Sequence, residues 1–300
     1  MEDQVQGDVV EQNVGQTTRE ALNVSMPDVE LASEIPSVQD GVIEDGIREM
    51  MAAMDAQSEE ANLLRDMIGR FCETEVDPFY DQWERDEVLP RDIWFKLGAA
   101  GFLCVDIPEA YGGAGGTFDM SMVINAEFSR RGYPSLGGNM TVHSDIVAHY
   151  LLNHGTEEQK QHWLPALADG SQVPCFALTE PGAGSDAGAI SATGTVFRAE
   201  SGELMLRLSW DKRYITLAAI ASVLGLAFQL HDPENLLGKG PTPGITCALI
   251  PTSTKGVVLG RRHDPLGVPF YNCPTTGRDV IVPLEEAIIG GSGGAGRGWL

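Results

Sequence analysis

The spacing of hydrophobic residues changes near Val173, and this change limits the folds open to the chain. Between residues 57 and 172 apolar side chains recur at helical spacing, whereas after residue 173 they alternate as in strands. Leu206 and Leu208, for instance, share one face of a short segment, while Arg207 lies on the other face. We therefore expect an α+β protein: an all-α N-terminal domain followed by a β-barrel-like or β-sandwich domain.

The helical half contains signals for the ends of helices. Pro90 suits a first helical turn, because that turn leaves its backbone N–H groups unbonded. Thr156 and Gln159 form a capping-box pattern, and Gly170 suits the end of the helix that follows. An apolar stripe at helical spacing runs through Leu63, Leu64, Met67, Ile68, Phe71 and Cys72. Further helices are expected from residue 91, over 119–129, over 145–152 and from 156 to 170.

The second half contains short apolar runs separated by Gly, Pro and Asp, as is typical of strands joined by turns. Strands are expected at residues 175–179, 203–210, 244–250, 256–260 and 279–282. Residues 215–230 stay open, because a continuous apolar run of this kind fits either a buried strand or a buried helix.

The N-terminal segment differs from both halves. Residues 1–60 hold fifteen acids and two bases, and no Phe, Trp or Tyr occurs before Phe71. Such a segment buries little apolar surface, so we expect residues 1–56 to form a largely disordered acidic extension. One amphipathic helix is expected within it, resting on the body of the protein or docking to a partner. Its apolar positions are Ile43, Ile47, Met50, Met51 and Met54.

Charge and cysteine content exclude several classes of function. The net charge of −23 opposes binding to a phosphate backbone, so no nucleic-acid partner is expected. Five cysteines without a CxxC pair predict neither a disulfide framework nor a zinc site. The chain shows no secretory signal, and its longest nearly apolar run, residues 215–230, is too short for a transmembrane helix. These features predict a cytoplasmic protein.

The first candidate site segment is residues 176–189, where a strand runs into a glycine-rich turn. Extended backbone at residues 177–179 offers N–H and C=O groups in a row, which could bond the edge of a planar heterocycle. The turn could bring the Ser185 hydroxyl near a polar or anionic ligand group. An ordinary strand–turn–strand is the alternative.

The second candidate segment is residues 210–216. Tyr214 could cover one face of an aromatic ring system, and Thr216 would present a hydroxyl on the same side of a strand. The alternative is an edge strand with a packed tyrosine.

Together the two segments resemble the acyl-CoA dehydrogenase family, in which TEPGAGSD and K-R-[WY]-I-T lie some thirty residues apart. Here these motifs occupy residues 179–186 and 212–216. The resemblance extends over about residues 60 to 300, and residues 210–291 look closest to the bacterial dehydrogenases of fatty-acid β-oxidation. Further matches are Pro108–Gly113, Gly155–Lys160 and Trp163–Pro165.

The resemblance implies a fold and a reaction. The N-terminal α-domain would cover residues 57–172 and the middle β-domain, which binds flavin and acyl-CoA, residues 173–288. Residues 289–300 would begin a truncated C-terminal four-helix domain. The reaction would be α,β-dehydrogenation of a fatty acyl-CoA to the trans-2-enoyl-CoA, with FAD as cofactor. Electron-transfer flavoprotein or a similar acceptor would be the partner, and a homo-oligomer would form if the C-terminal domain is supplied.

The resemblance also assigns roles to residues. Phe176, Leu178 and Thr179 would contact the flavin pyrimidine ring, Tyr214 and the Ile215 backbone would lie against the isoalloxazine, and the Thr216 hydroxyl would bond N5. Ser185 would contact acyl-CoA. The family usually has Trp at position 214, and Tyr keeps a flat but smaller face.

No acid of this sequence matches the family's catalytic base. Glu180 lies within the loop motif, and Glu285 and Glu286 lie near its end, but neither place corresponds to the base. The base is expected beyond residue 300. Two alternatives therefore stay open: a non-catalytic or split subunit that needs a partner chain, and an acyl-CoA oxidase.

Overall fold

The computed structural model describes residues 59–265 and 268–298. The acidic extension over residues 1–56 and the amphipathic helix over residues 43–54 lie outside the described residues. Within the described part of the chain, no helix is long and apolar enough to cross a membrane.

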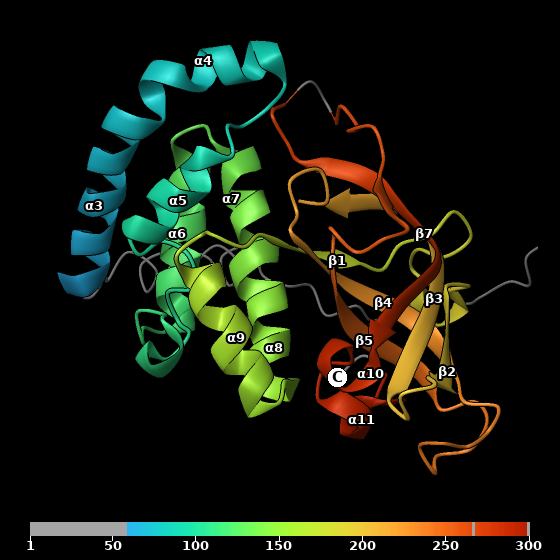
Figure 1. The fold of residues 1–300 in the computed structure, drawn as a ribbon. Coiled ribbons are helices and arrows are strands. Elements are labelled where there is room, and N and C mark those ends of the chain that lie inside the picture. Colours follow the sequence, from blue (N-terminus) through green and yellow to red (C-terminus); the bar gives the residue numbers. More distant parts are fainter. Residues whose placement is uncertain (1–58, 266–267, 299–300) are drawn as a thin grey trace, which may run out of the picture. The chain divides into compact units, whose positions relative to one another are not determined.

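Residues 59–168 form helices that gather on one side of the sheet (Figure 1). In chain order these helices are α3 Glu59–Glu75, α4 Asp77–Asp86, α5 Asp92–Ala99, the 3-10 turn η1 Glu109–Tyr111, α6 Phe118–Arg130, α7 Pro134–Thr141, the π-helical turn η2 Val142–Val147, α8 Ala148–His154 and α9 Glu157–Ala168.

The observed helix ends can be compared with the capping signals found in the sequence. The capping box that opens α9 is confirmed: Thr156 Oγ1 accepts from Gln159 N–H (3.2 Å), and Gln159 Oε1 accepts from Thr156 N–H (3.0 Å). Gly170 follows the end of α9 with φ of 74°. Pro90 lies at the first turn of α5, which begins at Asp92, since its carbonyl accepts from the Ile93 N–H (3.2 Å).

The apolar stripe of α3 is narrower than the sequence predicts. Ile68 and Cys72 are fully buried, whereas Leu63 is 58% and Met67 39% exposed. The helix presents a single narrow face to the core, so apolar residues beside that face remain at the surface. The helix expected over residues 145–152 is part of a longer run, since α7, η2 and α8 follow one another without a break from 134 to 154.

The second half forms one curled seven-stranded sheet in the order β1-β4-β2-β3-β7-β6, with β5 paired to β4 (Figure 1). β4 pairs in parallel with β1 and with β2, and the other pairings are antiparallel. The strands are β1 Pro174–Ala177, β2 Thr193–Arg198, β3 Leu204–Thr216, β4 Val223–His231, β5 Gly244–Pro251, β6 Val257–Leu259 and β7 Asn272–Pro283. A 3-10 turn, η3 Ala187–Ala189, precedes β2, and two short helices, α10 Leu284–Ala287 and α11 Gly291–Gly294, follow β7.

The structure settles the ambiguous run over residues 215–230. Its first residues complete β3, a turn follows, and most of the remainder is β4. β2 and the first half of β7 were not expected. Both contain a glycine that carries no hydrophobic signal but is required by packing: a Cβ on Gly194 would lie 2.4 Å from the Phe228 ring, and one on Gly277 would lie 2.3 Å from the Trp210 ring.

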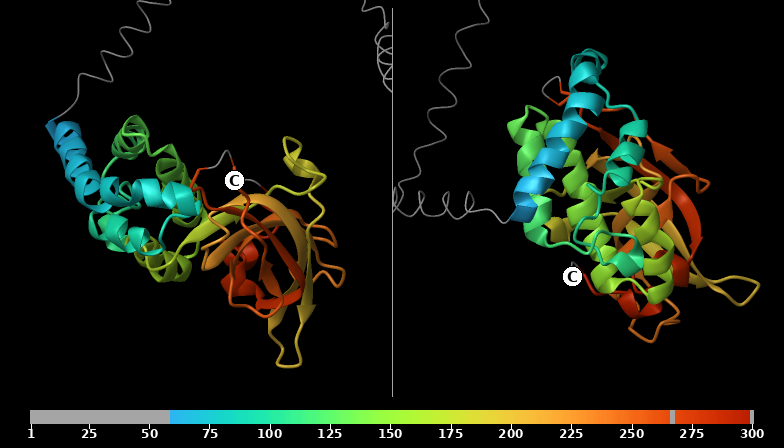
Figure 2. Two further views of the ribbon diagram at one scale, coloured as in Figure 1. Left: turned by 90° about the horizontal axis from the view of Figure 1, so that it is seen from above. Right: turned by 90° about the vertical axis from the view of Figure 1, so that its left-hand side faces the viewer.

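Side chains from the helices and from the sheet pack together in two hydrophobic clusters. Figure 2 shows the helices and the sheet from two further directions. Trp94 of α5 meets Tyr271, the residue before β7, edge to face with ring centroids 5.9 Å apart. The Trp94 indole N–H donates to Nδ1 of the fully buried His143 (3.1 Å), whose Nε2 bonds Leu167 O (2.9 Å). The expected order, a helical part followed by a β part, is confirmed, and the boundary expected at 172–173 falls between α9 and β1.

Candidate functional site

The two candidate segments lie side by side, although more than thirty residues separate them. The Arg213 N–H donates to Thr179 O (2.9 Å), and the Lys212 ammonium donates to Leu178 O (2.9 Å). β1 ends at Ala177, so Leu178 and Thr179 continue the chain just beyond the strand rather than within it. The residues that follow β1 and the last residues of β3 are therefore adjacent in the structure.

A buried ion pair joins these segments. Lys212 Nζ lies 2.7 Å from Glu180 Oε1, with the lysine side chain fully buried and the glutamate side chain 2% exposed. Glu180 also accepts hydrogen bonds from the Ser191 N–H and hydroxyl (both 2.6 Å) and from the Ala192 N–H (2.9 Å). Every oxygen of this carboxylate is therefore bonded to at least two donors.

The environment fixes the charge of the pair. Burial alone would raise the pKa of Glu180, but the hydrogen bonds from Lys212, Ser191 and Ala192 outweigh it and hold the pKa at about 2. Burial lowers the pKa of Lys212, an effect that its hydrogen bond to Glu180 partly offsets. A carboxylate with so low a pKa is a poor proton acceptor at neutral pH, so Glu180 is not suited to act as a general base.

A β-bulge near the end of β3 decides where Tyr214 lies. Lys212 pairs with Thr275 and Ile215 with Cys273, so three steps along β3 match two steps along β7. Without the extra residue, Tyr214 would fall on the buried face with Lys212. Instead it has a φ of 56° and is 68% exposed, and Ile215 takes the buried position. The alternation expected over 214–216 fits the burial of these residues, with Tyr214 exposed, Ile215 buried and Thr216 half-buried, and the bulge breaks the alternation only between Lys212 and these positions.

Polar groups behind Thr216 connect it to Tyr214. The Asn272 amide donates to Thr216 Oγ1 (3.4 Å), and Asn272 Oδ1 lies 2.7 Å from His263 Nδ1. The His263 ring in turn lies against the Tyr214 ring, with centroids 5.0 Å apart. The Thr216 oxygen is thus engaged as an acceptor, which leaves its hydrogen to donate elsewhere. The sequence analysis missed both His263 and Asn272, because no local pattern links them to Thr216.

The remaining predicted residues lie at the two ends of this surface. Phe176 is half-buried and stacks on Tyr150 of α8, with ring centroids 5.1 Å apart. Ser185 is exposed in the loop that begins with a tight turn between Glu180 and Ala183. The structure brings Leu178 and Thr179 to Arg213, next to Tyr214, while Ser185 lies on the loop that Glu180 closes.

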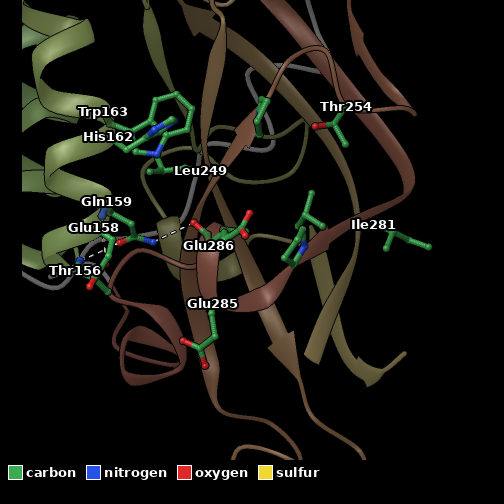
Figure 3. Close-up of a pocket in the computed structure, with 14 residues that line it drawn as sticks. Thr156, Glu158, Gln159, His162, Trp163, Leu249, Thr254, Ile281, Glu285 and Glu286 are labelled. Atoms are coloured by element: carbon green, nitrogen blue, oxygen red, sulfur yellow. Dashed lines mark hydrogen bonds between the residues drawn. The ribbon is translucent and has the colours of Figure 1, made fainter. Parts of the chain in front are cut away.

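A pocket of about 840 Å³ lies elsewhere, between α9, β5 and the end of β7 (Figure 3). Its lining includes the apolar side chains of Trp163, Leu249 and Ile281, and the carboxylates of Glu158 and Glu286. It contains none of the residues predicted to contact flavin or acyl-CoA. Among the described residues, no cluster of three His, Cys, Asp or Glu could hold a metal ion.

With this geometry in place, comparison with known proteins identifies the family. Residues 58–171 match the model of the acyl-CoA dehydrogenase N-terminal domain, and residues 175–280 match that of the acyl-CoA dehydrogenase middle domain. The chain belongs to the acyl-CoA dehydrogenase family. The resemblance found in the sequence is therefore confirmed.

Individual acyl-CoA dehydrogenases and related enzymes align with most of the described residues. The human mitochondrial short-chain specific acyl-CoA dehydrogenase is 37% identical over 198 residues, which is 66% of this chain and 45% of that protein. A 3-(aryl)acrylate reductase of Clostridium sporogenes is 32% identical over 225 residues, covering 75% of this chain and 55% of that protein. The chain spans about half the length of the curated relatives it matches.

Solved acyl-CoA dehydrogenases share the fold. The enzyme from Geobacillus kaustophilus superposes with a TM-score of 0.69 at 32% identity, covering 80% of this chain and 60% of that one. A glutaryl-CoA dehydrogenase from Mycobacterium smegmatis, solved in complex with FADH2, superposes with a TM-score of 0.66 at 23% identity, covering 77% of this chain and 55% of that one.

Proposed function

We propose that this chain supplies the helical and β parts of an FAD-dependent dehydrogenase that converts a fatty acyl-CoA to the trans-2-enoyl-CoA. The observation that carries the proposal is the outward-facing Tyr214 on a bulged strand, next to Thr216. The preceding residue, Arg213, bonds Thr179 through its backbone N–H, so the two candidate segments meet here. An exposed aromatic ring beside aligned polar groups suits a flat heterocycle. The glutaryl-CoA dehydrogenase solved with FADH2 supports the choice of flavin.

The residues of this chain fit the cofactor in specific ways. Tyr214 would cover one face of the ring system, and Thr216, whose oxygen already accepts from Asn272, would donate its hydrogen to the ring. Leu178 and Thr179 would bond the pyrimidine edge, with Phe176 and Ile215 alongside. FAD, when bound, accepts the hydride from the β-carbon of the substrate.

The substrate would lie beside the loop that carries Ser185, whose exposed hydroxyl would contact the acyl-CoA. The α-proton must leave to a base, and Glu180 is excluded from that role by its four donors and its pKa of about 2. In this proposal the base lies beyond residue 300. The electrons would pass to electron-transfer flavoprotein or a similar acceptor. The protein would be cytoplasmic, and a homo-oligomer would form if the C-terminal domain is supplied.

Binding of FAD to the purified protein tests the proposal. We expect flavin fluorescence to be quenched on titration, and Tyr214→Ala to raise the FAD dissociation constant by roughly two- to tenfold, since aromatic stacking contributes about 0.5–1.5 kcal/mol. Thr216→Val should raise it by a similar factor. Phe79→Ala, which truncates another exposed aromatic side chain, in α4, serves as the matched control. Equal affinities for the wild type and both site variants would contradict the assignment.

A further inference from the structure

The Glu180–Lys212 pair is poorly explained as a source of stability. Removing two charges from water costs several kcal/mol for each ion, and buried pairs can often be replaced by apolar side chains without loss of stability. Both side chains here are almost completely buried. The pair adds little net stability, yet it forms hydrogen bonds to several backbone groups. The segments to which those backbone groups belong indicate a different role for the pair.

Lys212 controls the backbone of the cofactor segment. Its ammonium accepts no hydrogen bonds and donates to Leu178 O at 2.9 Å, which turns that carbonyl toward the protein interior. In a trans peptide the C=O of one residue and the N–H of the next point in opposite directions. The Thr179 N–H is therefore directed away from Lys212. The lysine thus sets the orientation of the Leu178–Thr179 peptide.

Glu180 controls the substrate loop. It begins the loop over residues 181–190, and its carboxylate bonds the backbone N–H groups of Ser191 and Ala192, where the loop ends. A single side chain thereby closes the loop that carries Ser185. The Ser191 hydroxyl adds a third bond to the same carboxylate.

We propose that Glu180 and Lys212 are positioning residues that fix the cofactor segment and the acyl-CoA loop in one geometry through their shared ion pair. This inference rests on the proposed function, since it concerns the placement of Thr179 and Ser185 toward flavin and acyl-CoA. Glu180 oxygen atoms bond the loop end, Lys212 bonds the strand end, and the 2.7 Å contact between them couples the two. Neither residue touches the reacting atoms in this assignment.

Glu180→Gln is the central variant, because glutamine has the same shape but replaces one acceptor oxygen with an NH2 group. That group would face N–H donors of Lys212, Ser191 or Ala192. We expect the FAD dissociation constant to rise at least tenfold. Glu127→Gln is the matched control: Glu127 is equally buried and bonds Arg130 and Arg131, but lies in α6. It should lower the thermal unfolding midpoint while leaving FAD affinity unchanged.

A double variant separates positioning from general stability. In Glu180→Gln with Lys212→Met neither charge of the pair remains, so we expect the unfolding midpoint to recover toward the wild-type value. The Leu178 carbonyl loses its Lys212 donor in this variant, so FAD affinity should remain at least tenfold weaker than in the wild type. A double variant with wild-type FAD affinity would overturn the proposal.

Hydrogen exchange tests the coupling without any cofactor. Glu180→Gln should speed amide exchange at residues 181–192 and also at 178–179, whereas Glu127→Gln should change neither segment. If Glu180→Gln speeds exchange only in the loop, or in neither segment, the coupling would be refuted. If the wild-type protein fails to bind FAD while Glu180→Gln still speeds exchange in both segments, the proposed function alone would be contradicted.

Discussion

Two buried carboxylates, one in the helices and one in the sheet, find their partners in different ways. Glu127 of α6 bonds Arg130 and Arg131, three and four residues further along the chain, at the end of that helix. Glu180 bonds Lys212, thirty-two residues away, together with Ser191 and Ala192. The hydrogen bonds of Glu127 follow from helical geometry, and Arg65 of α3 adds an ion pair at 3.8 Å, whereas the bonds of Glu180 require the whole sheet to be assembled.

The difference separates two roles for a buried charge. The hydrogen bonds of Glu127 stabilise the end of one helix, since neighbours on one helix face meet as soon as the helix forms. The contacts of Glu180 instead join backbone that is far apart along the chain, since its carboxylate bonds Ser191, Ala192 and Lys212. Loss of a charge partner should therefore have unequal consequences in the two regions.

The largest effect is expected from Lys212→Met. It leaves the Glu180 carboxylate buried without a counter-charge, which should lower the free energy of unfolding by about 3–5 kcal/mol. Arg130→Met should cost less than about 1 kcal/mol, because exposed ion pairs contribute little. Arg130 is 69% exposed, and Arg131 would still pair with Glu127. Urea denaturation followed by circular dichroism measures both, and equal losses would remove the contrast between the regions.

The same contrast explains how much of the fold could be predicted. The capping box at Thr156, the glycine after α9 and the extent of α6 depend on residues within four positions, so the sequence alone indicates them. β2 and the first half of β7 were missed. Gly194 and Gly277 weaken the strand pattern there, and each is needed because a distant aromatic ring occupies the space of its Cβ.

The candidate site also has features that local sequence predicts and features that depend on distant residues. Its two segments could be found because each is a continuous motif. The bulge that turns Tyr214 outward depends on the register of β3 against β7, which no local pattern gives. Glu180, His263 and Asn272 gain their roles only through partners far along the chain. Long-range hydrogen bonds of this kind leave no periodic signal in a sequence.

A pH titration sharpens the comparison, because the helical part holds a group that titrates in a different range from Glu180. Burial lowers the pKa of His143 from 6.5 to about 4. The unfolded chain therefore binds a proton more readily, and stability is complete above pH 6.5 and declines as the pH falls toward 4. The loss should reach about 3 kcal/mol by pH 4. Glu180, with a pKa of about 2, contributes stability that is lost only below about pH 4.3.

His143→Gln provides the comparison for this titration. A glutamine can accept from the Trp94 indole and donate to Leu167 O, but it does not gain a proton in this range. The difference in unfolding free energy between wild type and variant should shrink steadily from pH 7 to pH 4. A constant difference across that range would show that His143 does not titrate as its burial implies.

The smallest effects come from adding one methyl group in each region, and they should differ in sign. Gly277→Ala in β7 places a Cβ 2.3 Å from the ring of Trp210, which is 3% exposed and cannot move freely. Overpacking of this kind costs roughly 1–3 kcal/mol. Gly137→Ala in α7 meets its nearest atom only at 3.5 Å, an ordinary contact, and removes a flexible residue from a helix. It should stabilise the fold by roughly 0.5–1 kcal/mol. Thermal unfolding of both variants measures the two shifts, and a destabilised Gly137→Ala would show that α7 is packed as tightly as the sheet.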